Sequence, residues 1–98
     1  SMMDMIKCNK KAVMGMVREE NWGISPERIT QFLLAQPDVI QTSNGFSCRN
    51  CRIYLTPIPG QLMGKWPHTR SLIRVEGPES EVIEIHRRIF LQFLSAGG

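Results

Sequence analysis

Two cysteines lie three positions apart in the segment CRNC, residues 48–51, a spacing found in zinc sites and in redox-active disulfides. A structural zinc ion needs four ligands, and no second pair of this kind exists to complete the site; the other candidates are Cys8, His68 and His86. On a regular strand the two cysteines would point to opposite faces, and redox-active pairs of this spacing begin a helix. We therefore expect buried, inert cysteines, no metal site and no cofactor.

His86 is the main candidate for acid–base chemistry, and it stands between Val82 and Phe90 on the apolar side of a helical pattern. A general acid or base needs a nucleophile or a carboxylate within reach, whereas Glu81 and Glu84 fall on another side of the same helix. The chain also has no phosphate-binding glycine loop and no zinc-protease motif. We therefore expect His86 to be a core residue with its ring nitrogens satisfied, and the protein not to be an enzyme.

Positive charge is concentrated in the middle of the chain. No Asp or Glu occurs between Val39 and Val75, and all nine acidic residues lie outside this window, although the net charge is only +3. Basic and aromatic side chains together suit a polyanion, because cations neutralise phosphates and rings stack on bases. The candidate nucleic-acid-binding residues are Arg49, Arg52, Tyr54, Lys65, Trp66, His68, Arg70 and Arg74. Two alternatives stay open: a solvated basic sheet face, and a loop at 60–68 whose apolar residues close one end of the core.

A chain of 98 residues with 42% hydrophobic residues has the size and composition of one globular domain, so we expect a single domain over residues 1–98. In it we expect Ser1 to be a tag remnant and residues 95–98 to form a frayed tail. No apolar run approaches the roughly 20 residues of a membrane span, and no signal peptide is recognisable. The three cysteines cannot form a complete disulfide framework, which favours an intracellular location, cytoplasmic or nuclear.

Apolar spacing and turn residues predict the secondary structure. The positions of Val13, Met16 and Val17 predict a helix from Asn9 to Glu20. Ser25 can cap a second helix, which ends before Pro37 because the residue preceding a proline avoids helical geometry. The other expected elements are a first strand at 3–8, a brief strand at 39–42, strands at 46–56 and 69–76, and a final helix from the turn at 78–81 to about residue 94.

The two central strands, 46–56 and 69–76, are joined by one loop and should pair antiparallel. Side chains alternate across a strand, so each strand has one apolar side for the core. The predicted core side consists of Cys51, Ile53, Leu55, Ser71, Ile73 and Val75. The residues predicted to meet on the opposite face are Arg52, Tyr54, Arg70 and Arg74, with Leu72 among them.

The final helix has an unusually wide apolar arc, formed by Val82, Ile83, Ile85, Ile89, Phe90, Phe93 and Leu94. Leu91 falls on the far side of the helix. A surface helix normally buries a narrower stripe. The breadth of this arc predicts either a deeply packed helix or one that also meets a protein partner or a second copy of the chain.

The resulting β-α-α-β-β-α order and the segment IRVEGPESEVIEIHRRI, residues 73–89, together resemble the K-homology (KH) RNA-binding module of eukaryotic type. The resemblance implies an α+β fold with a mostly antiparallel sheet packed on helices; a ferredoxin-like fold, which also uses strand–Gly-Pro–helix endings, is the alternative. KH modules clamp the nucleic-acid backbone with a Gly-x-x-Gly loop between two helices. Here that connector reads NWGIS, residues 21–25, with Gly23 alone, so the likeness is to a degenerate KH domain without the loop.

These observations predict a non-enzymatic module that binds RNA or single-stranded nucleic acid through a basic and aromatic sheet face and loop. The alternative is a degenerate KH-like domain for protein interaction or self-association, without nucleic-acid binding. A third interpretation, a small accessory or regulatory protein of phage or plasmid type, has no specific residue pattern for or against it.

Overall fold

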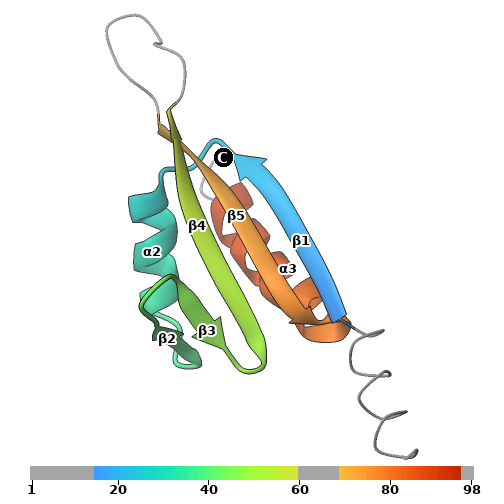
Figure 1. The fold of residues 1–98 in the computed structure, drawn as a ribbon. Helices are drawn as coiled ribbons and strands as arrows, with labels where there is room; N and C mark the ends of the chain where they lie inside the picture. Colours follow the sequence, from blue (N-terminus) through green and yellow to red (C-terminus); the bar gives the residue numbers. More distant parts are fainter. Residues whose placement is uncertain (1–14, 60–68, 96–98) are drawn as a thin grey trace, which may run out of the picture.

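The computed structural model describes residues 15–59 and 69–95, which form five strands and two helices (Figure 1). The elements in chain order are β1 (Gly15–Trp22), α2 (Pro26–Leu34), β2 (Val39–Gln41), β3 (Phe46–Cys48), β4 (Cys51–Pro59), β5 (Thr69–Pro78) and α3 (Glu79–Ser95). The strands make one antiparallel sheet in the order β1-β5-β4-β3-β2. The predicted α+β class is confirmed.

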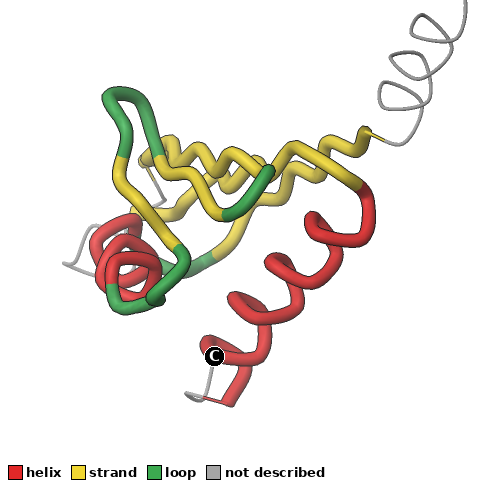
Figure 2. The backbone as a smooth tube through the Cα atoms, turned by 90° about the horizontal axis from the view of Figure 1, so that it is seen from below, coloured by secondary structure: helices red, strands yellow, loops and turns green. Residues whose placement is uncertain are grey.

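Both helices cover the same face of the sheet, as Figure 2 shows from below. The core lies between them and the sheet, and its most deeply buried large side chains are Ile29, Leu33, Ile53, Val75, Val82 and Ile89. No helix among the described residues covers the opposite face of β1, β4 and β5 (Figure 1). We call this uncovered side the open face.

The helix predicted from Asn9 to Glu20 is wrong over its described part, because residues 15–22 form strand β1. The strand pairs along its whole length with β5, from Gly15 opposite Pro78 to Trp22 opposite Ser71. Exposed and half-buried side chains alternate along it, and Val17, assigned to a helical core stripe, is 57% exposed. The spacing of Val13, Met16 and Val17 is compatible with a helix, but residues 15–22 are extended because they pair with β5. Residues 9–14 and the strand predicted at 3–8 lie outside the described residues.

The described elements therefore run β-α-β-β-β-β-α instead of the predicted β-α-α-β-β-α. The connector at 21–25, expected between two helices, joins a strand to a helix. The β1 strand lies beside β5 in space although some fifty residues separate them in sequence. This pairing brings residues from outside the acid-free window onto the same sheet as its arginines.

The helix predicted after Ser25 is confirmed as α2. The Ser25 side chain accepts a hydrogen bond from the backbone N–H of Arg28 at 3.4 Å, and Pro26 occupies the first turn, where it loses no needed donor. Ile29 and Leu33 are buried against the sheet, as the spacing predicted. The brief strand predicted at 39–42 is confirmed as β2.

The strand predicted over 46–56 is divided by a two-residue turn into β3 and β4. Arg49 makes this turn possible by adopting a positive φ of 55°. Strand β4 then continues past Pro57 to Pro59, where the sequence predicted a break. Strand β3 pairs with β4 only as far as Ile53, so beyond that residue one side of β4 has no described neighbouring strand. Pro57 and Pro59 are tolerated in this part of β4 because a backbone N–H on that side would have no strand to donate to.

The strand predicted at 69–76 is confirmed as β5, which extends to Pro78 before the chain turns directly into α3. Gly77 takes a φ of 152° at this corner. On α3, only part of the wide apolar arc is in the core, namely Val82, Ile85, Ile89 and Phe93. Ser95, which the sequence placed in a frayed tail, is the last residue of α3.

Candidate functional site

The open face is built from three neighbouring strands whose side chains form rows across the sheet. Antiparallel partners lie on the same face, so the register fixes which residues meet. One row holds Glu19 of β1, Arg74 of β5 and Tyr54 of β4. The adjacent row holds Val17, Glu76 and Arg52, and the next two are Asn21–Leu72–Thr56 and Arg70–Ile58.

A shallow hollow of about 310 Å³ lies in the middle of the open face. Its lining residues are Glu19, Tyr54, Thr56, Leu72, Arg74 and Glu76. The hollow combines one aromatic ring, one aliphatic side chain and charges of both signs. Such a surface can bind a flat group by stacking while polar groups hold its substituents.

The arginines of the open face differ in how they are held. Arg74 Nη2 forms an ion pair with Glu76 Oε2 at 3.1 Å, and the Tyr54 hydroxyl donates to the other Glu76 oxygen at 3.4 Å. Arg70 Nε donates to Asn21 Oδ1 at 2.7 Å, which leaves its positive charge without a carboxylate partner among these contacts. Arg52 is exposed and stands opposite Glu76 in the β4–β5 register. Three arginines and two glutamates therefore share this face, and its net charge is modestly positive.

Four predicted binding residues are brought together on the open face: Arg52, Tyr54, Arg70 and Arg74. Arg49 is not among them. It lies in the β3–β4 turn, where Nη1 donates to Glu84 Oε2 of α3 at 2.7 Å and Nε stands 3.6 Å from Asp38 Oδ2. Its charge is therefore used to hold the hairpin to α3. Lys65, Trp66 and His68 lie outside the described residues.

Glu19, Asn21 and Glu76 are site residues that the sequence analysis missed. Glu19 was assigned to the helix predicted from Asn9 to Glu20, Asn21 was assigned to the connector after it, and Glu76 stands just after the acid-free window. The sequence gives no clear signal for this strand, because its helix-covered side combines Met16 and Trp22 with the charged Arg18 and Glu20, so apolar and polar residues do not alternate. The acid-free window in the sequence is thus not acid-free in space, because β1 contributes a carboxylate beside Arg74.

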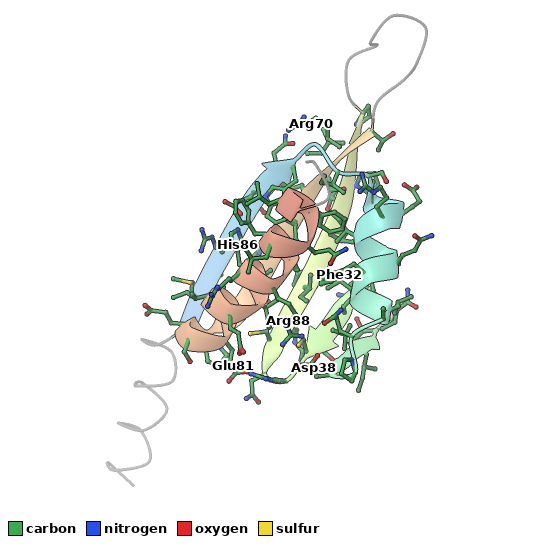
Figure 3. The ribbon with its side chains drawn as sticks, turned by 180° about the vertical axis from the view of Figure 1, so that it is seen from behind. Phe32, Asp38, Arg70, Glu81, His86 and Arg88 are labelled. Atoms are coloured by element: carbon green, nitrogen blue, oxygen red, sulfur yellow. The ribbon has the colours of Figure 1, made fainter. Side chains whose placement is uncertain are left out.

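A second cluster joins β1 to α3 on the helix-covered side. His86 of α3 is largely buried, and its Nε2 bonds to the Glu20 carboxylate of β1. Trp22 Nε1 donates to the same carboxylate oxygen at 3.2 Å. The His86 ring stacks on Phe90 at 6.0 Å between centroids and meets the edge of Trp22 at 5.6 Å. His86, predicted to be a core residue with its ring nitrogens satisfied, instead lies at the edge of the core on α3 (Figure 3), 13% exposed, and its Nε2 has Glu20 as a partner that the sequence did not reveal.

The third cluster ties the hairpin to α3. Arg88 donates from Nη1 to Asp38 Oδ1 at 2.9 Å and from Nη2 to Oδ2 at 3.2 Å (Figure 3). Hydrogen bonding from Arg88 lowers the pKa of Asp38 below its ordinary value. A further contact joins Asn50, in the β3–β4 turn, to Glu81 near the start of α3. Both Glu81 carboxylate oxygens accept hydrogen bonds from the Asn50 side chain, and one of them also accepts from the Asn50 backbone N–H at 3.1 Å. These contacts connect the start of β2, the hairpin and α3, so we assign them a structural role.

The two cysteines of the CRNC segment lie directly opposite each other across the β3–β4 hairpin. The expectation that they point to opposite faces is wrong, because the turn at Arg49 reverses the chain between them. Both side chains are buried and both are free thiols. Within residues 15–59 and 69–95 no group of three or more metal-ligating side chains gathers around them or elsewhere.

We expect both thiols to be unreactive in the native protein. Burial raises the pKa of Cys51 to about 11 and also raises the pKa of Cys48. The thiolate is the reactive form, so at pH 8 the Cys51 rate should be about 100-fold below that of an unfolded chain. The measurement is release of thionitrobenzoate from Ellman's reagent in a Cys8→Ser background. Two thiols titrating within seconds without denaturant would contradict the prediction, whereas both should titrate in guanidinium.

Comparison with models of protein families gives no match to this chain, and searches of curated proteins and of solved structures give none either. The resemblance to KH modules therefore stays a prediction. No helix among the described residues is both long and apolar enough to traverse a lipid bilayer.

Proposed function

We propose that this protein is a non-enzymatic module that binds RNA or another single-stranded nucleic acid on its open face. The observation that carries the proposal is the position of Tyr54 on strand β4 of a sheet face that no described helix covers, with Arg74 opposite it on β5 and Arg52 two residues earlier on the same face. A tyrosine ring stacks on any base, and nearby guanidinium groups neutralise the phosphates that follow it.

The charges of the open face support a particular mode of binding. Arg52 and Arg70 carry no described carboxylate contact and are the residues for phosphate, whereas Arg74 is already paired with Glu76. With two to four phosphates neutralised, the logarithm of affinity should fall against the logarithm of salt with a slope of about −1.5 to −3. Stacking on Tyr54 and contact with Leu72 then supply the salt-independent part of the affinity.

A salt titration with dye-labelled 12-nucleotide RNA and DNA tests the proposal by fluorescence anisotropy. We expect Arg52→Gln to weaken binding about fivefold at low salt and to reduce the salt slope by about 0.7. The matched control is Arg28→Gln, which removes the same charge from α2 on the other side of the sheet and should leave both quantities nearly unchanged. No binding in low salt, or equal losses in the two variants, would exclude the open face as the site.

Stacking is tested separately at Tyr54. We expect Tyr54→Ala to weaken binding about tenfold, since base stacking on an aromatic side chain contributes about 1–3 kcal/mol. Tyr54→Phe keeps the ring and loses only the hydrogen bond to Glu76, so it should retain the affinity. Equal effects of the two substitutions would show that the ring does not stack on a base.

Protein interaction or self-association is the second candidate function. It is favoured by exposed apolar side chains on α3, where Ile83 and Phe90 are each 44% exposed and Leu94 is 59% exposed. These side chains lie away from the open face, so the two functions can coexist in one chain.

A further inference from the structure

Helix α3 has two apolar stripes, and the fold of one chain buries only the first. The buried stripe is Val82, Ile85, Ile89 and Phe93. The second stripe is Ile83, Phe90 and Leu94, spaced seven and four residues apart, which places these side chains on one side of the helix. A repeat of this kind is typical of a helix that packs against another helix.

The second stripe lies on the side of α3 that faces strand β1. Phe90 is within 6.1 Å of Trp22 between ring centroids, and His86 on the same side bonds to Glu20. An apolar groove of about 260 Å³ continues from the end of β1 to this stripe. It is lined by Trp22, Gly23, Ile24, Phe90, Phe93 and Leu94.

Strand β1 is the edge of the sheet on the same side. It is eight residues long and, among the described residues, pairs only with β5, so the backbone groups along its outer side have no strand partner. A long unprotected edge is a template for another strand. The unpaired edge and the exposed stripe are therefore neighbouring parts of one surface.

The charges of β1 are complementary to those of a second β1. In an antiparallel pair related by a two-fold axis at Glu19, a residue lying a given number of positions before Glu19 faces the residue lying the same number of positions after Glu19 in the other strand. Arg18 then stands opposite Glu20 of the partner subunit, twice by symmetry, and Met16 stands opposite Trp22 of the partner subunit. This register also keeps the helices of both copies on the same side of the sheet.

The neighbouring register with the same faces, centred on Arg18, would set two like charges against each other on the helix side. Centring on Glu19 instead places its two carboxylates together on the open face, where each has Arg74 as its neighbour on β5. Opposite charges directly across a strand pair stabilise it and like charges destabilise it. The sequence of β1 thus favours one register.

We propose that two copies of this chain associate through their β1 strands into one continuous ten-stranded antiparallel sheet, with the two α3 helices side by side beneath it. Because α3 packs beneath both β1 and β5, strand spacing places the two helix axes about 10–14 Å apart. At that separation the second stripes of the two helices, including Phe90 and Leu94, cover each other. The dimer leaves both open faces on the same outer side.

A charge-exchange experiment tests the interface and its register on the full chain by sedimentation velocity from about 1 to 500 µM. We expect wild type to form a dimer in this range, and Arg18→Glu and Glu20→Arg each to raise its dissociation constant at least about tenfold. An equimolar mixture of these two variants should dimerise again, because one strand then presents carboxylates where the other presents guanidinium groups. A wild-type monomer at the highest concentration, or no recovery on mixing, overturns the proposal.

The second stripe has its own test, since Glu20→Arg also removes the contact with His86 and can weaken the fold. Leu94→Glu, near the exposed end of α3, should raise the dissociation constant at least about tenfold while the circular dichroism spectrum is unchanged. The matched control is Leu34→Glu, because Leu34 is 49% exposed but belongs to α2. If Leu94→Glu and Leu34→Glu dimerise equally well, the proposal is overturned. It is also overturned if the wild-type chain stays monomeric and its β1 edge pairs only with a strand of a different protein. The same anisotropy titration with oligonucleotides should show that the monomeric Leu94→Glu variant still binds. Loss of dimerisation can then be distinguished from loss of binding on the open face.

Discussion

Gly77→Ala should destabilise the protein by about 3 kcal/mol, although it adds only one methyl group. Gly77 occupies the corner between β5 and α3 with a φ of 152°, which side-chain-bearing residues rarely adopt. A Cβ atom there would lie 2.8 Å from Cys51 Sγ and 2.9 Å from the Asn50 carbonyl oxygen. Backbone strain and steric overlap therefore act together, and the hairpin turn cannot move away without breaking the contacts of Asn50 with Glu81.

The free energy of unfolding in guanidinium measures this effect. Ser80→Ala, an exposed site three residues later, is the control and should change stability by less than about 0.5 kcal/mol. The double variant Gly77→Ala/Cys51→Ala should be less destabilised than the sum of the single changes, because removing the sulfur relieves the overlap with it. Gly77→Ala with wild-type stability would mean that the corner does not have this conformation.

Asp38→Asn should lower the free energy of unfolding by about 2 kcal/mol at neutral pH, since hydrogen bonds between charged groups contribute more than neutral ones. Asp38 accepts both hydrogen bonds of the Arg88 fork and lies beside Arg49, so it joins the start of β2, the hairpin and α3. Its removal leaves Arg88 partly buried without a carboxylate. Contact with solvent moderates the loss, because both side chains are 28% exposed.

The same substitution has a defined pH dependence. The folded-state pKa of Asp38 is lowered from 3.8, chiefly by the hydrogen bonds from Arg88, so ionised Asp38 stabilises the folded state above pH 3.8. That stabilisation is lost as the pH falls through the lower folded-state pKa. The difference between wild type and Asp38→Asn should therefore be largest from about pH 5 to 7 and shrink toward pH 2.

Urea denaturation at a series of pH values measures this difference. The matched control is Glu27→Gln, an exposed acid in the first turn of α2, which should change stability by less than about 0.5 kcal/mol at every pH. A difference between wild type and Asp38→Asn that stays constant from pH 2 to 7 would contradict the role assigned to the Asp38 carboxylate.

Local residue chemistry in the sequence was sufficient for several elements. Ser25 and Pro26 specify the start of α2 through capping and a fixed φ, which depend only on neighbouring residues. Alternation along β4 and β5 correctly assigned Ile53, Ile73 and Val75 to the core and Arg52, Tyr54 and Arg74 to the other face. The same period-two logic placed four of the eight predicted binding residues on one surface.

Only the tertiary structure decided what stands beside those residues. The conformation of 15–22 depends on pairing with β5, the last strand, so the apolar spacing of Met16 and Val17 was misleading. The pairing brings Glu19 next to Arg74 and Glu20 next to His86, and the turn at Arg49 places Cys48 opposite Cys51. Local propensity and side-chain period are properties of consecutive residues and can be read from the chain, whereas strand order and turn geometry are set by contacts between distant segments.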